Sequence, residues 1–313
     1  MSDVEPLRED RASKPRIVCI GNIAIDHLLY VDSLPDLDEV AVVRDRRTCL
    51  GGRGALAALI LGALGCDVSL CTVVGGGIPE KWIAFLREYS VDISTLTIEH
   101  NHTSVNESYV LIGKSEQNCI SAFMGYPIHS LPTPIQEQTS TNADYLYLST
   151  HDKRFNSHIL RLAQSTVQQI VHSLSGQLLR DRSYAILVSE RSTVLVGNER
   201  DTAKFLATLN VTVDSLFRER NQLRALFMTQ GAAGVQVYER GEPPRSIEVK
   251  PVPVVTPVGI GDAFSAGMVY GLASGLNPLG AARTGIALAT ESLRAPTTHP
   301  DLAGLRERIQ GFL

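Results

Sequence analysis

Strand-like and helix-like segments alternate along most of this 313-residue chain, and no other feature restricts its fold as strongly. Short β-rich runs lie at 16–20, 68–73, 145–148, 193–196 and 225–228. Apolar residues at helical spacing predict helices between these runs, over 53–65, 80–89, 156–173 and 199–206. Neighbouring parallel strands need a crossover segment, usually a helix. The order therefore predicts an α/β fold with a mainly parallel sheet covered by helices on both faces.

Further strand-like runs lie at 27–31, 40–43, 104–112 and 119–123, and turn-forming residues separate the first two. The first pair forms an excursion from the strand at 16–20. No repeat, low-complexity tract or linker divides the chain, so we expect one domain over 16–313. Residues 1–15 are polar and acidic without an apolar core, which predicts a short disordered leader rather than a signal peptide.

Composition and charge exclude several classes of protein. The chain has 29 Lys and Arg against 33 Asp and Glu, a net charge of −4, so we expect no nucleic acid or anionic lipid as partner. Its most apolar run, 55–65, is far shorter than the ~20 residues that span a bilayer, so no membrane segment is predicted. The five cysteines are odd in number and never spaced C-x-x-C, which argues against a disulfide framework or zinc ribbon and favours a cytoplasmic location.

The strongest chemical signal lies in residues 255–267, with the sequence V-T-P-V-G-I-G-D-A-F-S-A-G. Phe264, Met268 and Leu272 repeat at helical spacing, so the glycine pair before them predicts a helix N-terminus at 259–262. Free N–H groups at such an end bind anions, and Asp262 in the first turn could take a proton from an attacking hydroxyl. Phosphoryl transfer needs both functions. The alternative is a plain turn followed by an acidic residue.

This segment resembles the signature D-T-x-G-A-G-D-x-F-x-x-G of the ribokinase-like (PfkB) family of carbohydrate and nucleoside kinases. Other motifs extend the resemblance over nearly the whole chain, at 21–26, 51–55, 198–201 and 229–234. The resemblance implies an ATP-dependent phosphotransferase with an alcohol acceptor and a ribokinase-like α/β/α sandwich fold. The central sheet would be mainly parallel, with a small β-sheet lid from about 27–50 and 104–124. Lid strands in this family often pair, so a homodimer through the lid is a further expectation.

The resemblance also implies roles for individual residues. The catalytic group would be the base Asp262 with the anion hole formed by Gly259, Ile260 and Gly261. The substrate would be bound by Asn22, Asp26, Gly51, Gly52, Arg53 and Phe123. ATP would be bound by Asn198, Thr229, Gly231, Gly234, Gly259 and Gly261. Mg²⁺ would be held through water by Asn198 and Asp201.

Several of these roles also have a direct physical reason. Asp26 follows a predicted strand, where open α/β sheets bind ligands, and a carboxylate can accept two vicinal hydroxyls; a surface turn is the alternative. The acidic pair in 198–201 suits a hard cation that keeps its waters, and helix capping by Asn198 is the alternative. Gly51 and Gly52 form either a tight turn or a hinge for a closing lid.

The chain departs from the family pattern at several positions. Leu56 stands where the G-G-x-x-x-N motif has a substrate-binding asparagine. Thr256 replaces the first Asp of the signature, which puts monovalent-cation binding in doubt. Other departures are Gly76, Asp201, Val258 and Ile260. Backbone N–H groups can form an anion hole despite such changes, but the losses leave a second class open, a non-catalytic ligand-binding protein that kept the kinase fold.

The acceptor predicted from these features is a ribonucleoside or related ribosyl compound, with a free sugar as the alternative. Apart from Arg53, the motifs supply few basic side chains for a substrate phosphate, which favours a neutral acceptor. Phe123, Met124 and Tyr126 could pack against a nucleobase or simply within the lid or core. Their segment, with His129, and residues 176–179 resemble archaeal-type nucleoside kinases.

Overall fold

The computed structural model describes residues 14–102, 104–113, 118–123, 131–149, 152–163, 166–175 and 178–312, with backbone only at 118–123 and 178. In these residues the main sheet has the strand order β14-β13-β12-β11-β10-β9-β1-β4-β5, and β6 also pairs with β4. Its strands are β1 (Arg16–Ile20), β4 (Asp67–Gly75), β5 (Val91–Asp92), β6 (Leu96–Glu99), β9 (Tyr145–Leu148), β10 (Gln169–Ser173), β11 (Val194–Asn198), β12 (Ala225–Thr229), β13 (Val235–Glu239) and β14 (Arg245–Ile247). The pairs of β13 with β12 and β14 are antiparallel, and the others are parallel. The predicted α/β fold with a mainly parallel sheet is confirmed.

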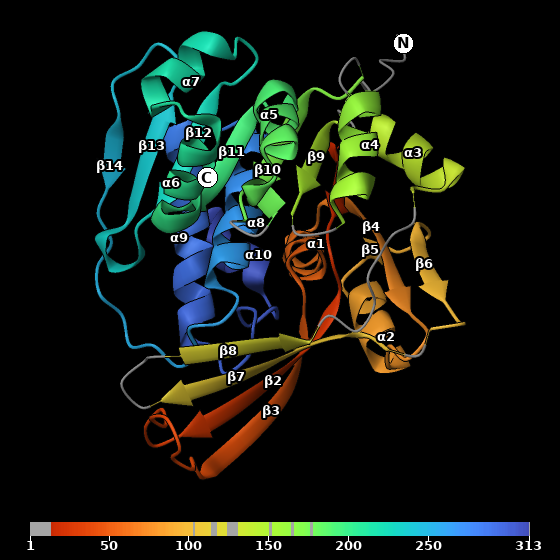
Figure 1. Ribbon diagram of the computed structural model, residues 1–313, viewed down its shortest axis with the longest axis vertical. Helices are drawn as coiled ribbons and strands as arrows, with labels where there is room; N and C mark the ends of the chain where they lie inside the picture. The colour runs from red at the N-terminus through yellow and green to blue at the C-terminus, as the bar shows by residue number, and fades with distance from the viewer. Residues whose placement is uncertain are drawn as a thin grey trace, which may run out of the picture.

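Helices cover both faces of this sheet (Figure 1). One face carries α1 (Arg53–Ala63), α2 (Glu80–Glu88), α8 (Ile260–Ala273), α9 (Pro278–Arg294) and α10 (Leu305–Gln310). The other carries α3 (Pro134–Thr141), α4 (Lys153–Ala163), α5 (Arg182–Arg191), α6 (Glu199–Leu209) and α7 (Val213–Glu219). Short 3₁₀ helices are η1 (Leu178–Arg180) and η2 (Gly231–Ala233). In the described part of the chain, none of the helices combines the length and apolar character that crossing a bilayer requires.

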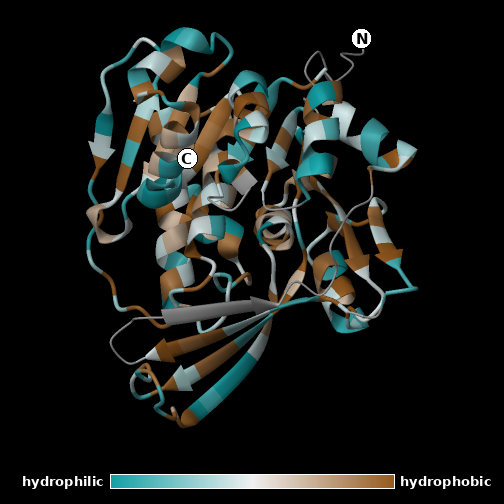
Figure 2. Ribbon diagram, in the orientation of Figure 1, coloured by the Kyte–Doolittle hydropathy of each residue, from teal (hydrophilic) through white to brown (hydrophobic). Residues whose placement is uncertain are grey.

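Strand β1 shows how one segment contributes to both halves of the core. Ile17 and Cys19 pack in the cluster under α1 and α8, whereas Val18 and Ile20 pack in the cluster under α4 and α5. All four side chains are fully buried. Figure 2 shows the same pattern along the sheet, with hydrophobic strands inside and hydrophilic residues on the outer helix surfaces. Because β1 is covered on both faces, successive side chains must all be apolar, which explains the continuous apolar run in its sequence.

A second, smaller sheet lies apart from these layers, at the bottom of Figure 1. Its order is β3-β2-β7-β8, formed by β2 (Ala24–Val31), β3 (Val43–Gly51), β7 (Asn106–Gly113) and β8 (Asn118–Phe123). Strand β2 pairs antiparallel with β3 and parallel with β7. The small sheet has an apolar cluster of its own, made of Leu28, Cys49, Val110 and Ile112. The function of this sheet as a lid stays a prediction.

Two predicted elements are wrong. The helix predicted over 156–173 ends at Ala163, and 169–173 form the buried strand β10. The prediction merged α4 and β10 into one helix, because the apolar pattern of a short buried strand cannot be told from that of a buried helical segment. The strand predicted at 40–43 is also wrong, because β3 starts only at Val43 and continues through exposed charged residues. Charged side chains of this kind are common on edge strands, where they prevent pairing with other sheets.

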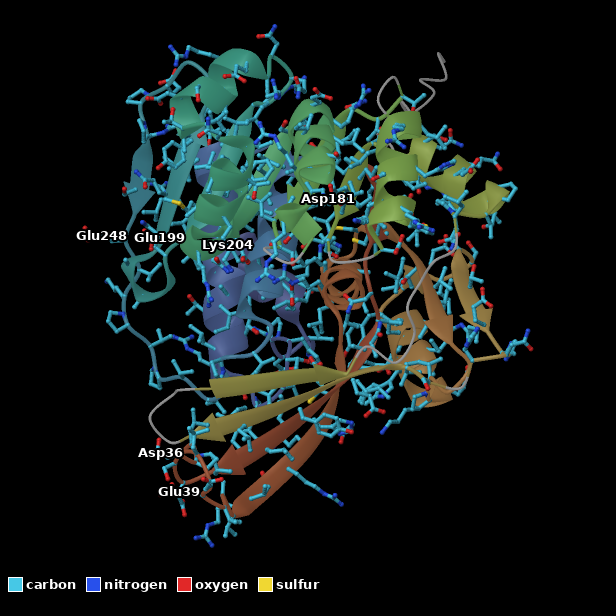
Figure 3. All side chains as sticks on the ribbon, in the orientation of Figure 1. Asp36, Glu39, Asp181, Glu199, Lys204 and Glu248 are labelled. Carbon is cyan, nitrogen blue, oxygen red and sulfur yellow. The ribbon has the colours of Figure 1, made fainter. Side chains whose placement is uncertain are left out.

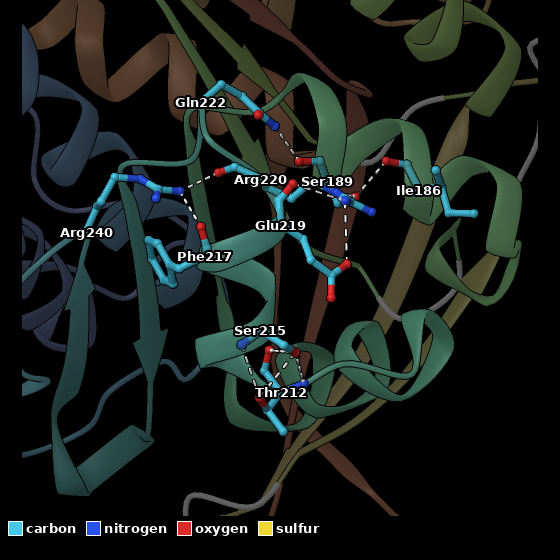
Figure 4. Close-up of polar contacts among 9 residues, drawn as sticks. All are labelled: Ile186, Ser189, Thr212, Ser215, Phe217, Glu219, Arg220, Gln222 and Arg240. Carbon is cyan, nitrogen blue, oxygen red and sulfur yellow. Dashed lines mark hydrogen bonds and ion pairs between the residues drawn. The ribbon is translucent and has the colours of Figure 1, made fainter.

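Helix α7, which the sequence did not predict, is attached to the sheet edge by polar contacts (Figure 4). Thr212 and Ser215 form a capping box that starts the helix. At its other end, the Arg240 side chain, next to β13, donates hydrogen bonds to the carbonyl groups of Phe217 and Arg220. The carbonyl groups at the end of a helix lack intrahelical partners, so these contacts both terminate α7 and hold it against β13.

Candidate active site

A cavity of about 610 Å³ lies where the small sheet meets the carboxyl edge of the main sheet. Strands β2 and β7 line one side, the N-terminal ends of α1 and α8 line another, and the ends of β10, β11 and β12 complete the wall. Ligands of open α/β sheets bind at this edge. The predicted site residues that line the cavity are Asn22, Asp26, Gly52, Arg53, Asn198, Asp201, Thr229, Gly259, Ile260, Gly261 and Asp262.

The sequence predicted that Asp26 follows the end of a main-sheet strand. Asp26 instead lies within β2, so it belongs to the small sheet. Its side chain is 7% exposed, and Ser108 Oγ on β7 donates a hydrogen bond of 2.5 Å to Oδ1. Burial raises the pKa of Asp26, and the Ser108 bond opposes this shift. Gly51 lies directly beside the carboxyl, because a Cβ there would be 2.3 Å from Asp26 Cγ.

The N-terminus of α8 starts at a glycine that no other residue can replace. Gly259 has a φ of 82°, and a Cβ on it would lie 1.9 Å from the Thr298 carbonyl oxygen. Its own carbonyl accepts hydrogen bonds from the N–H groups of Asp262 and Ala263, at 3.1 and 2.9 Å. The first N–H groups of a helix have no intrahelical acceptor. The 14-residue helix therefore presents an anion-binding end to the cavity.

Asp262 lies in the first turn of α8, on the cavity wall. Burial raises its pKa to about 6; Asp26 also raises this pKa, and Arg53 lowers it. A carboxyl group with a pKa near the working pH can both accept and release a proton, which is what a general base requires. The same position lies beside helix N–H groups that can stabilise negative charge on a transferred group.

Arg53 begins α1 and joins three parts of the cavity. Its backbone N–H donates to Asn22 Oδ1 at 3.2 Å, and Nη1 donates to the Leu174 carbonyl at 3.3 Å. Gly52, just before it, has a φ of 91°, and a Cβ there would lie 2.4 Å from the Asn22 carbonyl oxygen. The loop that connects β3 to α1 therefore passes close to the loop that connects β1 to β2, which explains the glycine at this position.

Asn198 and Asp201 form the helix cap, one of the two alternatives that the sequence left open, and the cation site stays a prediction. Asn198 caps α6, because its Oδ1 accepts a hydrogen bond from Asp201 N at 2.7 Å, while its Nδ2 donates to Asp201 Oδ2 at 3.1 Å. Both residues also line the cavity. Within the described ranges, no cluster of three or more His, Cys, Asp and Glu side chains is arranged to bind a metal ion. Oxygen donors at this wall nevertheless suit a hard cation that keeps most of its waters.

The motif at 229–234 is only partly on the cavity wall. Thr229, at the end of β12, lines the cavity. Gly231 and Gly234 flank the next turn, at φ angles of 58° and 98°, and neither is among the described residues of the wall. A Cβ on Gly234 would lie 2.0 Å from the Ile247 carbonyl oxygen, so this glycine allows β13 to pass close to β14.

Several cavity residues were missed by sequence reasoning. They include Asn106, Glu107 and Ser108 on β7, Ser173 at the end of β10, Ser175 just after it, and Pro257 and Ser265 around the start of α8. On β7 the wall residues are Asn106, Glu107, Ser108 and Val110, and the sequence shows no polar–apolar alternation among them, because the first three are all polar. A run of polar residues normally indicates a solvent face, so the pairing of β7 with β2 was needed to identify the wall.

The structure also locates the departures from the family pattern. Leu56 is buried on the cavity wall. Thr256 is buried beneath the small sheet, where its Oγ1 is 2.8 Å from the Tyr30 hydroxyl. Gly76 is not among the described wall residues, and its N–H donates to the His102 carbonyl at 2.6 Å. The lost acidic residue at Gly76 therefore removes no group from the described part of the wall.

Part of the predicted acceptor site lies outside the described residues. The backbone of Phe123 pairs with Glu107 at the end of β8, but its side chain is outside the description. Met124, Tyr126, His129 and residues 176 and 177 also lie outside the described residues. The packing of an aromatic base against this segment therefore stays a prediction.

Known proteins resemble this chain over most of its length. The chain is 25% identical to a nucleoside kinase of Methanothermobacter thermautotrophicus over 95% of each chain. It is 28% identical to an ATP-dependent ribose-1-phosphate kinase of Halopiger xanaduensis, over 81% of this chain and 83% of the relative. The crystal structure of a Methanocaldococcus jannaschii nucleoside kinase, an archaeal member of the ribokinase family, superimposes with a TM-score of 0.78 at 20% identity, over 95% of this chain and 98% of the other. The profile of the pfkB family carbohydrate kinases matches residues 14–302, and the chain belongs to that family.

Proposed function

We propose that this protein transfers the γ-phosphoryl group of ATP to a primary hydroxyl of a ribonucleoside or related ribosyl compound. One observation carries the proposal: Asp262, the N-terminus of α8 and Asp26 line the same cavity. A base, an anion-binding end of a helix and an acceptor of substrate hydroxyls are the groups that in-line phosphoryl transfer needs. The membership of the pfkB family supports the reaction type.

In the proposed reaction, Asp26 holds hydroxyl groups of the acceptor while the primary hydroxyl faces Asp262. Asp262 takes the hydroxyl proton as the oxygen attacks the γ-phosphorus. A new oxygen–phosphorus bond forms, the bond to the β,γ-bridging oxygen breaks, and ADP leaves with that electron pair. The backbone N–H groups of residues 259–261 stabilise the charge on the transferred group.

The proposed nucleotide partner includes Mg²⁺, which would neutralise phosphate charge when bound. Asn198 and Asp201 lie on the wall next to Thr229 and offer oxygen atoms, so they fit a cation held through its own water ligands. Gly231 and Gly234, which lie beyond Thr229, stay candidates for contacts with the ATP phosphates.

The charge of the wall favours a neutral acceptor over a phosphorylated one. Arg53 is the one Lys or Arg among the described wall residues, and its guanidinium lies near Asp262. Four carboxyl groups share the wall, from Asp26, Glu107, Asp201 and Asp262. A second anion on the acceptor would be repelled by this wall. A nucleoside therefore fits better than ribose 1-phosphate, although kinases of both kinds are among the relatives.

A free sugar and a non-catalytic ligand-binding protein are the alternatives. A protein without turnover would have no use for a carboxyl group at Asp262 on the cavity wall. The raised pKa of that carboxyl supports an enzyme.

A panel of acceptors with ATP and Mg²⁺, assayed for ADP release, tests the proposal. The panel contains the common ribonucleosides, free ribose, ribose 1-phosphate, and a reaction without acceptor. We expect acceptor-dependent ADP release with a ribonucleoside, and none with the matching 5′-deoxynucleoside, which lacks the primary hydroxyl. ADP release that is independent of every acceptor would refute the proposal.

We also propose a homodimer formed through the small sheet. The loop between β2 and β3 exposes Leu37 and Val40 almost completely, at 96% and 92%, and Val42 at 61%. The acidic residues Asp36 and Glu39 lie at the same tip (Figure 3). Sedimentation of the intact protein, compared with a variant that carries Val40→Ser, measures whether these apolar residues support association.

A reducing compartment such as the cytoplasm is the proposed location. The cysteines Cys19, Cys49, Cys66 and Cys71, in the described part of the chain, are free thiols. Burial raises the pKa of Cys19 and Cys71, so both remain protonated and unreactive at neutral pH.

A further inference from the structure

A hydrogen bond joins the small sheet to the segment that leads into α8. The Tyr30 hydroxyl on β2 lies 2.8 Å from Thr256 Oγ1, although the two residues are 226 positions apart in the sequence. Thr256 is fully buried. A buried hydroxyl that loses its partner is left unsatisfied, which costs more than the loss of a bond at the surface. The bond therefore holds residues 255–258 against β2.

The ring of Tyr30 is restricted by its neighbours. Arg47 on β3 lies over the ring, with 5.9 Å between its Cζ and the ring centroid, and its Nη1 donates to the Pro296 carbonyl at 3.5 Å. The ring also packs against the apolar cluster of the small sheet, and Val258, two residues after Thr256, packs against the same cluster. The small sheet therefore meets this segment through one polar and one apolar contact.

The same segment is anchored to the main body on its other side. The backbone N–H of Val255 donates to the Leu293 carbonyl, at the end of α9, at 2.7 Å. The segment continues directly into Gly259, where the anion-binding end of α8 begins. Because it is held between α9 and β2, a change in either support displaces the free N–H groups of that end.

Asp26 and Tyr30 lie on one face of the same strand. Side chains alternate along a strand, so residues four apart share a face and are separated by about 13 Å. Asp26 pairs with Ser108 and Tyr30 pairs with Ile112 on β7, which places both on the side of the sheet that faces the main body. Strand β2 therefore connects the carboxyl proposed to hold the acceptor with the segment that supports the anion-binding end.

We propose that Tyr30 is a positioning residue whose hydroxyl, acting through Thr256, holds the anion-binding end of α8 in line with the bound acceptor. The inference rests on the proposed function and adds a residue that is not among the described residues of the cavity wall. Small displacements of the groups that align and stabilise a transferred phosphoryl group lower the rate, because catalysis depends on their exact placement.

The test compares Tyr30→Phe with the parent in kcat and in KM for ATP and for a ribonucleoside. Phenylalanine keeps the ring and removes the hydroxyl. We expect kcat to fall by about 3- to 10-fold, the effect of one lost hydrogen bond, while both KM values stay within about twofold. A merely structural hydroxyl would lower Tm and leave the kcat of the folded enzyme unchanged, which would overturn the inference.

Thr256→Val tests whether the two hydroxyl groups act together. We expect the same loss of kcat, and a double variant no more than about twofold below either single variant, because both changes remove one bond. Thr256→Ser keeps the hydroxyl and should retain kcat within about twofold of the parent. Losses that multiply in the double variant would show that the two hydroxyl groups act separately and would contradict the inference.

Tyr145→Phe is the matched control. The Tyr145 hydroxyl donates to the Leu272 carbonyl at 2.9 Å, so the same substitution removes a bond of similar length at the other end of α8. It should lower Tm and leave kcat unchanged, and an equal loss of kcat in this variant would overturn the inference. Thermal melting shows that each variant is folded at the assay temperature. A parent that phosphorylates no ribosyl compound would refute the proposed function, whereas an active parent with an unaffected Tyr30→Phe variant would overturn this inference alone.

Discussion

At the scale of single residues, the proposed chemistry depends most on Asp262. We expect Asp262→Asn to lower kcat by about 10²–10⁴-fold, because the amide keeps the shape of the side chain but cannot accept a proton. Asp214→Asn is the matched control, since Asp214 also lies in the first turn of a helix but not on the described cavity wall. Turnover of Asp262→Asn within about tenfold of the parent would contradict its role as base.

The rate should also depend on pH through Asp262. Burial raises the pKa of this carboxyl to about 6, so below that pH it is protonated and cannot accept the hydroxyl proton. We expect kcat to rise with pH through about 6 and to level off above it. The measurement is kcat at saturating ATP and acceptor from pH 5 to 8. A profile that stays flat down to pH 5 would show that another group takes the proton.

The same pKa predicts a stability effect. The folded protein binds the Asp262 proton more tightly than the unfolded chain, whose carboxyl has its ordinary value of 3.8. The stabilisation from this group is therefore complete below pH 3.8 and is lost as the pH rises to about 6. At pH 8, Asp262→Asn removes a desolvated charge, and its Tm should be no lower than that of the parent. A clearly lower Tm at pH 8 would mean that the carboxylate stabilises the fold.

At the scale of elements, the start of α8 has two glycines with different constraints. Gly259 has a positive φ and no room for a Cβ, whereas a Cβ on Gly261 would meet nothing within 4 Å. We expect Gly259→Ala to lower both Tm and activity. Gly261→Ala should keep or raise Tm, since alanine favours a helix by up to about 1 kcal/mol, while its methyl group obstructs the anion-binding end. Thermal melting and ADP release separate the two effects, and full activity of Gly261→Ala would contradict an anion site there.

The sequence predicted elements well where one periodicity extended over a whole segment. The helix at 80–89 and the strand at 145–148 agree closely with α2 and β9. Prediction failed over 156–173, where an apolar strand follows an amphipathic helix after a short connection. The charged strand β3 was also missed, because its residues pair as an edge strand without a buried face over most of their length.

At the scale of the whole molecule, the cavity is assembled from segments between Asn22 and Ser265 that meet at one edge of the main sheet. The contiguous motif at 259–262 could be recognised from the sequence, because its glycines and first-turn carboxyl are neighbours in the chain. The wall residue Ser108 could not, since its place beside Asp26 depends on the pairing of β7 with β2. Local patterns therefore indicated the chemistry, and the tertiary arrangement showed which residues form the rest of the wall.

The comparison of kcat/KM for the best ribonucleoside of the panel with that for free ribose tests the central claim most directly. Both acceptors offer a primary hydroxyl and neighbouring secondary hydroxyls, but only the nucleoside also has a base whose apolar surface can be buried in the site. Burial of apolar base surface worth about 1–2 kcal/mol predicts a preference of roughly 5- to 30-fold for the nucleoside. Equal or better use of free ribose would contradict the nucleoside assignment.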